Sequence, residues 1–492
     1  MRFLLILACA AFSLSGSVFG SDTPNILFII ADDASRHFGE AYGCDWVKTP
    51  NIDRLARNGI VFENAYTPTS KCAPSRAAIL TGRNPWQLEE AANHQPYFPV
   101  KYKAFSEALR EAGIAVGSQG KTWGPGDSKK ADGSPRDFGF TSSGGKGKGG
   151  PPGQAFATFL KKRDHSKPFF YWFGSANPHR PYKADSGIAA GKKLSDISHV
   201  PAYWPDNEIV RRDMLDYAVE VEAYDSEVGE LVTSLEQAGL AKNTLIVVTS
   251  DHGMPFPRVK GHTFEEAHHV PLIASWPQGI ANPGRRVGDL VSFIDLAPTF
   301  LEIMGVKPSD AGMAAVTGHS LLNLLQGQSK NDREFVVIGR ERNDVLTRPG
   351  SPAGLGYPVR GIRQGNLLYI HNFEPDRWPC GDPGTGFRDT DASPTKALTE
   401  SLPETSVYWQ FAFGKHPREQ LFDVSKDPDC VQDLAKDAAH AQKMAVMREL
   451  LMTELKRQDD PRVLGRGALF DNYLSPRTQT VDKPRKSSRP LP

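Results

Sequence analysis

The chain has 492 residues, of which 39% are hydrophobic and 23% are charged, a composition typical of a soluble globular protein with about two to four domains. The formal net charge is +1, so bulk electrostatics favour neither nucleic acid nor an acidic partner. We therefore expect no nucleic-acid partner.

Residues 1–20 have the pattern of a secretory signal peptide. Arg2 precedes an apolar run over residues 3–12, and Gly20 suits cleavage before Ser21. A membrane anchor would need roughly 20 apolar residues, and this run is too short. The sequence therefore predicts an exported protein, periplasmic or secreted, with no membrane span.

Apolar runs alternate with helical patterns in the part of the chain that follows. The runs, which indicate buried strands, cover residues 25–30, 113–118, 169–173 and 244–249, and the helical patterns cover 105–111, 213–238 and 296–304. This alternation predicts an α/β fold in which a mostly parallel sheet is covered by helices on both faces. Each run leads into polar residues, and ligands of such sheets bind beyond the carboxyl ends of the strands. We therefore expect one rim to carry Asp32, Asp33, Lys121, His179, Asp251 and His252.

The remainder of the chain predicts a second, smaller unit. Residues 359–363 and 367–370 look like paired strands, and residues 439–455 have a helical pattern. The glycine- and lysine-rich stretch 141–152 is expected to be a flexible loop. The predicted boundaries are a catalytic domain over 21–358, a C-terminal α+β subdomain over 359–458 and a polar, disordered tail over 459–492.

The segment Cys72-Ala73-Pro74-Ser75-Arg76, followed by Thr81-Gly82-Arg83, is the most informative part of the chain. A lone buried cysteine is usually structural, but this pattern resembles the signature of the formylglycine-dependent (type I) sulfatases. The resemblance implies an alkaline-phosphatase-like sandwich. It also implies that a maturation enzyme oxidises Cys72 to an aldehyde, formylglycine, whose hydrate supplies the attacking oxygen. Arg76 can then hold the hydrate and a metal-bound oxyanion by charge-assisted hydrogen bonds.

Asp32, Asp33, Asp251 and His252, with an oxygen from residue 72, form the predicted metal site. An oxygen-rich ligand set suits a hard divalent cation, so Ca²⁺ is favoured over Zn²⁺ and over Mg²⁺. Alone, each pair would more often be turn or surface residues. The sulfatases, however, place an Asp-Asp pair after the first strand and an Asp-Asn or Asp-His pair, followed by glycine, late in the domain. The resemblance therefore implies that Cys72 and these four residues bind the metal.

The same resemblance implies roles for three basic residues. Lys121 resembles the lysine that binds nucleophile and sulfate, and His179 resembles the histidine near the leaving atom. Lys260 sits where a second basic residue contacts the sulfate, and Arg258 is an alternative for that role. Trp123 stands where many relatives have a histidine, which removes a hydrogen bond to the aldehyde hydrate and leaves the tryptophan as a candidate wall of the site.

The implied activity is removal of sulfate from a sulfated glycan. Within the family the chain resembles the heparan N-sulfatases (sulfamidases) at residues 253–257 and 421–428, so N-sulfoglucosamine is the first-choice substrate. The second unit and the loop around Trp123 and Arg342 are expected to wall the substrate pocket. One alternative is an O-sulfatase that acts on a glycosaminoglycan or an algal polysaccharide. More distant alternatives are a phosphodiesterase or phosphatase of the same fold, against which Cys72 argues, and a non-catalytic calcium-dependent glycan-binding protein.

Besides Cys9, which lies in the predicted signal peptide, three cysteines have no part in this chemistry: Cys44, Cys380 and Cys430. In an oxidising compartment Cys380 and Cys430 are candidates for a disulfide, although their spacing does not establish one.

Overall fold

The structure of the protein, a computed structural model, describes residues 23–142, 150–328 and 333–478. The predicted signal peptide, residues 143–149 of the predicted loop and residues 479–492 of the predicted tail lie outside the described residues. The described ends of the predicted loop are ordered. Residues 141–142 form a short strand, and a helix begins at Pro152.

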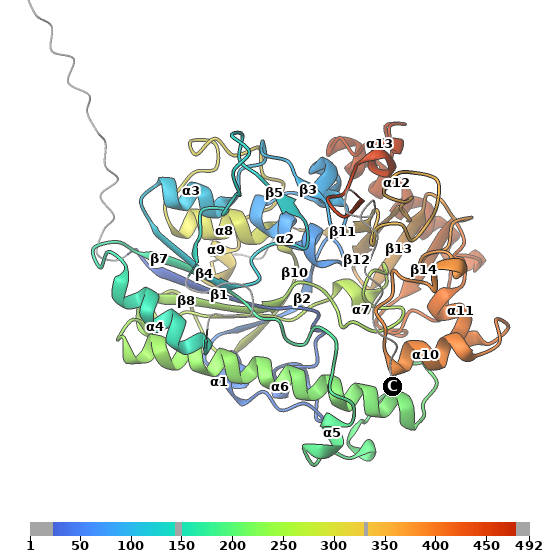
Figure 1. The fold of residues 1–492 in the computed structure, drawn as a ribbon, viewed down its shortest axis with the longest axis horizontal. Helices are drawn as coiled ribbons and strands as arrows, with labels where there is room; N and C mark the ends of the chain where they lie inside the picture. Colours follow the sequence, from blue (N-terminus) through green and yellow to red (C-terminus); the bar gives the residue numbers. More distant parts are fainter. Residues whose placement is uncertain (1–22, 143–149, 329–332, 479–492) are drawn as a thin grey trace, which may run out of the picture.

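A large mixed sheet forms the centre of the molecule (Figure 1). Within the described residues it has eight strands in the order β10-β2-β9-β8-β1-β7-β4-β6. Neighbouring strands are parallel except at β9, which is antiparallel to both β2 and β8. In the same order the strands span Arg285–Ser292, Ile60–Tyr66, Leu272–Ser275, Thr244–Ser250, Asn25–Ala31, Phe169–Gly174, Ala115–Gly120 and Thr141–Ser142. The prediction of a mostly parallel sheet is confirmed.

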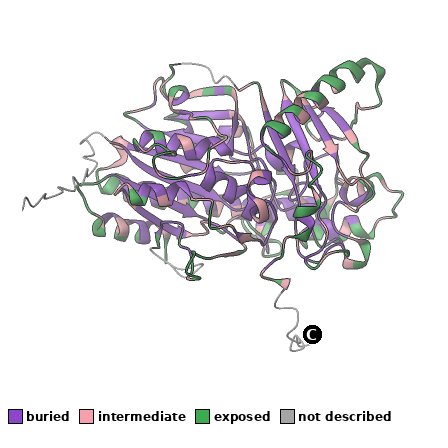
Figure 2. Cartoon of the chain, turned by 90° about the horizontal axis from the view of Figure 1, so that it is seen from above, coloured by how far each residue is buried: buried purple, intermediate pink, exposed green. Residues whose placement is uncertain are grey.

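Helices cover both faces of this sheet because its central strands are apolar on both sides. In β1, Ile26 and Phe28 belong to one hydrophobic cluster, and Leu27 and Ile29 belong to the other. The first cluster also contains residues of α2 (Cys72–Thr81), α3 (Phe105–Glu111), α8 (Leu296–Ile303) and α9 (Leu322–Leu325). The second contains residues of α1 (Pro50–Arg57), α4 (Pro152–Lys162), α6 (Glu208–Gln237) and α7 (Glu265–His268). The sheet is thus the middle layer of a sandwich, and its strands are buried in Figure 2 while the exposed residues lie on the outer helices.

A second sheet lies at the side of the first unit (Figure 1). Its strands are antiparallel and run in the order β11 (Phe335–Arg340), β12 (Val359–Gln364), β13 (Leu367–Asn372) and β14 (Glu419–Asp423). The helix α12 (Ala441–Arg457) packs on one face. On the other face Ile338 and Phe422 form a cluster with Phe264, which comes from the first unit. The apolar contact therefore joins the two units directly.

The chain beyond residue 459 differs from the predicted disordered tail, because residues 459–478 pack against the second unit. Asp460 is fully buried and accepts a hydrogen bond of 2.8 Å from Arg360 Nε. Phe470 is 1% exposed and joins the cluster under α12. Buried ion pairs, including that of Asp460 with Arg360, and the aromatic ring of Phe470 therefore hold a segment whose composition is polar.

The remaining α-helices and strands of the described residues are short: α5 (Ser186–Ala189), α10 (Pro394–Ser401), α11 (Val407–Phe413), α13 (Ala468–Asn472) and the strand pair β3 (Tyr97–Phe98) and β5 (Asp127–Ser128). Of the helices between residues 23 and 478 that the structure describes, none has the length and apolar character needed to cross a bilayer.

Candidate active site

The ends of β1 and β8 bring the predicted carboxylates together. The parallel register pairs Ala31 with Ser250, so the residues that follow each strand, Asp32 and Asp251, are neighbours. The amide of Asp33 donates a hydrogen bond of 3.1 Å to Oδ1 of Asp251. Three carboxylates from two strand ends therefore meet at one rim, and none of them is more than 3% exposed.

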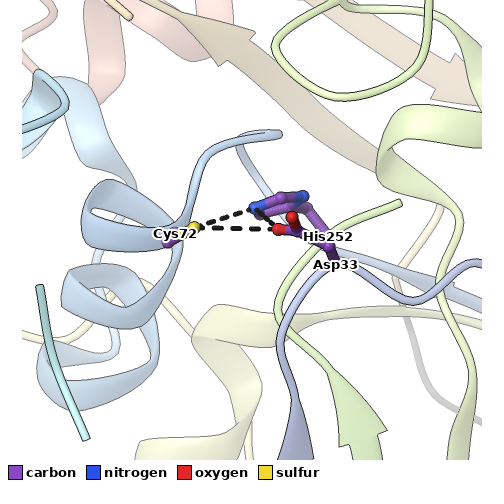
Figure 3. A group of neighbouring side chains, drawn as sticks. All are labelled: Asp33, Cys72 and His252. Atoms are coloured by element: carbon purple, nitrogen blue, oxygen red, sulfur yellow. Dashed lines mark hydrogen bonds and ion pairs between the residues drawn. The ribbon is translucent and has the colours of Figure 1, made fainter. Parts of the chain in front are cut away.

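The helix α2 places Cys72 against this rim, because Cys72 is its first residue. Two hydrogen bonds fasten the start of the helix: Ser75 Oγ donates to the carbonyl oxygen of Asp251 over 2.7 Å, and Trp123 Nε1 donates to that of Ala73 over 3.1 Å. The indole of Trp123 thus fixes the helix as well as lining the site. Figure 3 shows the result: Cys72 Sγ lies 3.3 Å from Nε2 of His252 and 3.8 Å from Oδ1 of Asp33.

The orientation of the His252 ring fits a bound cation. Its Nδ1 lies 3.0 Å from the carbonyl oxygen of Gly253, which can only accept, so Nδ1 carries the proton and Nε2 has a lone pair in the neutral ring. Burial lowers the pKa of His252 and favours this neutral form. The lone pair then faces Oδ1 of Asp33 at 3.1 Å. Two electron-rich atoms this close repel each other unless a proton or a metal cation lies between them.

The donor atoms also have the composition of a metal site. Asp33, Cys72 and His252 form one compact group of potential ligands, and Asp32, Cys72 and Asp251 form another, all from buried residues. Residue 72 belongs to both groups. With three carboxylates at its centre, the set suits a hard divalent ion.

Arg76 and Lys121 neutralise part of this acidic charge. Arg76 Nε lies 2.8 Å from Oδ2 of Asp251, and Nη2 lies 3.5 Å from Oδ1 of Asp32. Lys121 Nζ donates over 2.7 Å to each oxygen of Asp32. Burial alone would raise the pKa of Asp251, but the positive charges of Arg76 and Lys121 oppose it, and the pKa lies below its usual range. These carboxyl groups are therefore ionised.

A close approach of two glycines sets the position of Lys121. Gly120 has φ +74°, and a Cβ atom on it would lie 2.1 Å from the carbonyl oxygen of Gly174. A residue with a side chain would therefore clash where β4 and β7 end. The amide of Lys121 then donates over 2.9 Å to the same carbonyl oxygen, which directs the lysine to the rim.

Lys260 is the basic partner of Asp33, and it reveals a residue that the sequence patterns missed. Its Nζ donates to Oδ2 of Asp33 over 2.6 Å and to Oδ2 of Asp391 over 2.8 Å. Asp391 precedes α10 in the second unit. His179 completes the group: its Nε2 lies 3.7 Å from Oδ2 of Asp33, and ligand atoms of Asp33, His179 and Asp391 lie within 4.8 Å of one another. Because this group forms only through tertiary contacts, no local motif marks Asp391.

Arg258 and Arg342 lie outside this cluster. Arg258 is buried under the second unit, where Nη1 donates to the carbonyl oxygen of Phe411 over 3.1 Å and the guanidinium stacks on Phe264. Arg342 is also buried and donates to the carbonyl oxygen of Tyr473 over 2.8 Å. Arg258 is therefore bonded to the second unit and, unlike Lys260, has no contact with Asp33, and Arg342 is not among the residues that line the cavity next to the site.

The candidate disulfide is absent, since Cys380 and Cys430 are both free and buried. Cys380 packs with Trp409 and Phe413, whereas Cys430 belongs to the cluster around Phe264. The two thiols thus lie in different hydrophobic clusters.

Burial and the carboxylate of Asp32 raise the pKa of the Cys72 thiol well above its usual range. The unmodified residue is therefore a neutral thiol. Beside it, a cavity of about 660 Å³ is lined by Asp32, Lys121, Trp123, His179 and Glu227, among others. Trp123 thus contributes to the pocket wall, as expected.

A site of three carboxylates, three basic side chains and a motif cysteine beyond the ends of parallel strands agrees with comparisons to known proteins. The chain belongs to the sulfatase family: the family model described as Sulfatase matches residues 24–306. The prediction of a sulfatase, a hydrolase of sulfate esters or sulfamates, is confirmed.

Among characterised relatives, human N-sulphoglucosamine sulphohydrolase is 27% identical over 516 residues, covering 96% of this chain and 98% of the relative. An ulvan-active sulfatase of Formosa agariphila is also 27% identical, covering 87% of this chain and 74% of the relative.

Solved structures share the fold. A structure described as a complex with its substrate D-glucosamine-2-N,6-O-disulfate has a TM-score of 0.64 and 21% identity, covering 89% of this chain and 98% of that one. The phosphonate monoester hydrolase of Agrobacterium radiobacter has a TM-score of 0.65 and 18% identity, covering 90% and 97%. The fold alone thus accommodates more than one reaction, and the site must distinguish them.

Proposed function

We propose that this protein removes the N-sulfate group from a glucosamine residue of a sulfated glycan, with Cys72 converted to formylglycine and with a calcium ion bound. The position of Cys72 carries the proposal. It is buried at the start of α2 and lies in the same compact groups as Asp32, Asp33 and Asp251. A neutral buried thiol is a poor nucleophile. Conversion of the thiol to formylglycine would give residue 72 an oxygen nucleophile instead.

Asp32, Asp33, Asp251 and His252 would hold the calcium ion. The ion would serve as a Lewis acid and template, and the aldehyde hydrate at residue 72 would supply the oxygen nucleophile. A separate maturation enzyme is the partner that this proposal requires.

The charge of the site suits an anionic substrate. Counting only the side chains that pair with one another here, four carboxylates face three basic groups: Asp32, Asp33, Asp251 and Asp391 against Arg76, Lys121 and Lys260. The net charge of this set is −1, and a divalent ion brings it to +1. The site would then attract the single negative charge of a sulfamate or sulfate monoester, and the basic groups would offset charge on the sulfuryl oxygens.

His179 is the proposed acid for the leaving atom. Its Nδ1 lies 2.6 Å from the carbonyl oxygen of Arg180, which can only accept, so Nδ1 carries a proton and Nε2 is free to exchange one. The side chain is 38% exposed, in contrast to the buried carboxylates, so a substrate can reach it. An amine leaves readily only when it is protonated, and a proton held at Nε2 would meet that need.

The likeness to the human enzyme over nearly the full length of both chains supports N-sulfoglucosamine as the substrate. The likeness to an ulvan-active sulfatase favours a second candidate, an O-sulfate on an algal polysaccharide. The shared residues cannot separate the two, because a sulfamate and a sulfate ester differ chiefly in the leaving atom.

The test is sulfate release from N-sulfoglucosamine, 6-O-sulfated glucosamine, a 2-O-sulfated glycosaminoglycan and ulvan. The protein should come from a host that co-expresses a formylglycine-generating enzyme and, as a control, from one that lacks it. We expect release from N-sulfoglucosamine only with the matured protein. Release from O-sulfated sugars alone would overturn the proposed substrate.

We also propose that the protein is exported, because residues 1–20 have the pattern of a secretory signal peptide. Amino-terminal sequencing of protein recovered from the periplasm or medium should begin at Ser21. A mature chain that begins at Met1 would contradict export.

A further inference from the structure

We propose that Asp391 makes the active site selective for substrates whose leaving atom is nitrogen. The inference rests on the proposed N-sulfatase function and adds the residue that distinguishes a sulfamate from a sulfate ester. The carboxylate lies in a group with His179, the proposed acid for the leaving atom.

Asp391 is accessible where the other carboxylates are not. Its side chain is 25% exposed, whereas that of Asp33 is fully buried. Oδ2 accepts the hydrogen bond from Lys260, and among the described residues Oδ1 has no hydrogen-bond partner. The second oxygen therefore retains the capacity to accept a hydrogen bond, on a side chain that belongs to the same group as His179.

The surrounding loop fixes this carboxylate in place. Asp389, two residues earlier, accepts a hydrogen bond of 2.6 Å from Arg348. The carbonyl oxygen of Thr390 accepts a hydrogen bond of 3.2 Å from Lys396 Nζ. Both bonds are buried, so Asp391 is held by its neighbours on a well-packed loop and not on a solvated one.

The two candidate reactions differ in the charge of the product. Hydrolysis of a sulfamate breaks the S–N bond, forms an S–O bond and converts R–NH–SO₃⁻ and water into R–NH₃⁺ and SO₄²⁻. Hydrolysis of a sulfate ester breaks the S–O bond to the sugar and converts R–O–SO₃⁻ and water into R–OH, SO₄²⁻ and H⁺. Only the first reaction builds positive charge on the atom that leaves, and a fixed carboxylate beside that atom stabilises it.

The alternative role for Asp391 is to position Lys260 and nothing more. That role would affect every substrate alike, because Lys260 would contact the sulfuryl group that all of them share. A comparison of two leaving atoms in one variant therefore separates selectivity from positioning.

The experiment measures kcat/KM of matured wild type and Asp391→Asn on N-sulfoglucosamine and 6-O-sulfated glucosamine. We expect a loss of about tenfold or more on the N-sulfate and less than about threefold on the O-sulfate. The matched control is Asp344→Asn, which removes a carboxylate that is 21% exposed and that pairs with buried Lys71 at 3.0 Å. This control should leave the ratio of the two kcat/KM values unchanged.

Product inhibition gives a readout that does not need turnover of an O-sulfate. At about pH 6, below the ordinary pKa of an amine, glucosamine should inhibit the wild type about tenfold more strongly than N-acetylglucosamine. Asp391→Asn should lose this preference, and Asp391→Glu should keep part of it. The wild-type comparison stands even if Asp391→Asn does not fold.

The outcomes distinguish this inference from the proposed function. A wild type that cleaves N-sulfoglucosamine but shows no preference for glucosamine, or an Asp391→Asn variant that loses both activities equally, would overturn the role of Asp391 alone. A wild type that cleaves only O-sulfates would overturn the proposed substrate and the inference together.

Discussion

The Nε atom of Arg76 lies 2.8 Å from Oδ2 of Asp251, and neither side chain is exposed to solvent. One partner belongs to the cysteine motif on α2 and the other follows β8, so the ion pair joins two segments far apart in the sequence. Because water reaches neither group, each charge depends on the other for its compensation. The motif therefore stabilises the contact between α2 and the end of β8, in addition to containing Cys72.

Replacement of Arg76 by alanine should lower the free energy of unfolding by about 3–5 kcal/mol, since it leaves the carboxylate of Asp251 buried without its ion-pair partner. Denaturant titration of the cation-free protein measures this. Arg54→Ala is the control: it breaks an ion pair with Glu236 in which both side chains are more than 40% exposed, and it should cost less than about 1 kcal/mol. Similar losses in the two variants would contradict the buried pair.

The variant Asp33→Asn should bind calcium at least about tenfold more weakly, because it removes one negative charge from the ligand set without changing its shape. Metal content after dialysis, measured by elemental analysis, should fall from one ion per chain to well below one. Asp344→Asn, in which the lost carboxylate pairs with Lys71, should retain the ion. Equal metal content in wild type and Asp33→Asn would remove Asp33 from the ligand set.

Lys260→Gln and Arg258→Lys should separate a catalytic from a structural basic residue. Lys260→Gln should lower kcat by about 10²–10³, the effect of losing one donor to charge that develops in the reaction. Arg258→Lys should lower the melting temperature with little change in kcat, because Arg258 bonds to the carbonyl oxygen of Phe411. Kinetics and thermal unfolding of both variants provide the measurements, and the reverse pattern would restore Arg258 as the sulfate ligand.

Local patterns predict the parts of the fold and site in which consecutive residues belong to the same strand, helix or motif. The continuous apolar runs predicted β1, β4, β7 and β8, and the spacing of apolar residues predicted α3 with the bounds observed. The antiparallel β9, with four residues, and the half-exposed β10 carry weaker patterns and were not predicted.

The residues that the sequence did not predict depend on contacts between distant segments. Asp391 reaches the site from a loop of the second unit through its bond to Lys260. Asp460 lies in a polar segment that resembles a solvated tail, but it pairs with Arg360, the second residue of β12. A pair of this kind has no sequence signature, because neither residue is unusual among its own neighbours.

Glu227→Gln should make the protein more stable at high pH. Burial raises the pKa of Glu227 to about 7 from an ordinary 4.5. Between these values the folded protein keeps a proton that the unfolded chain releases, so the contribution of Glu227 to stability falls as pH rises from about 4.5 to about 7. The variant should gain up to about 3 kcal/mol at about pH 8 and nothing at about pH 4. Denaturant titrations of both proteins at the two pH values test this, and a gain independent of pH would contradict the raised pKa.

The modification of residue 72 tests the central claim most directly. Mass spectrometry of the tryptic peptide containing residue 72 should be compared with sulfate release for preparations matured to different extents. We predict that residue 72 loses H₂S and gains one oxygen, and that turnover rises in proportion to the modified fraction. Cys72→Ser should give at most a single turnover, because a serine adduct cannot regenerate an aldehyde. Full activity in protein whose Cys72 is an unmodified thiol would contradict the account.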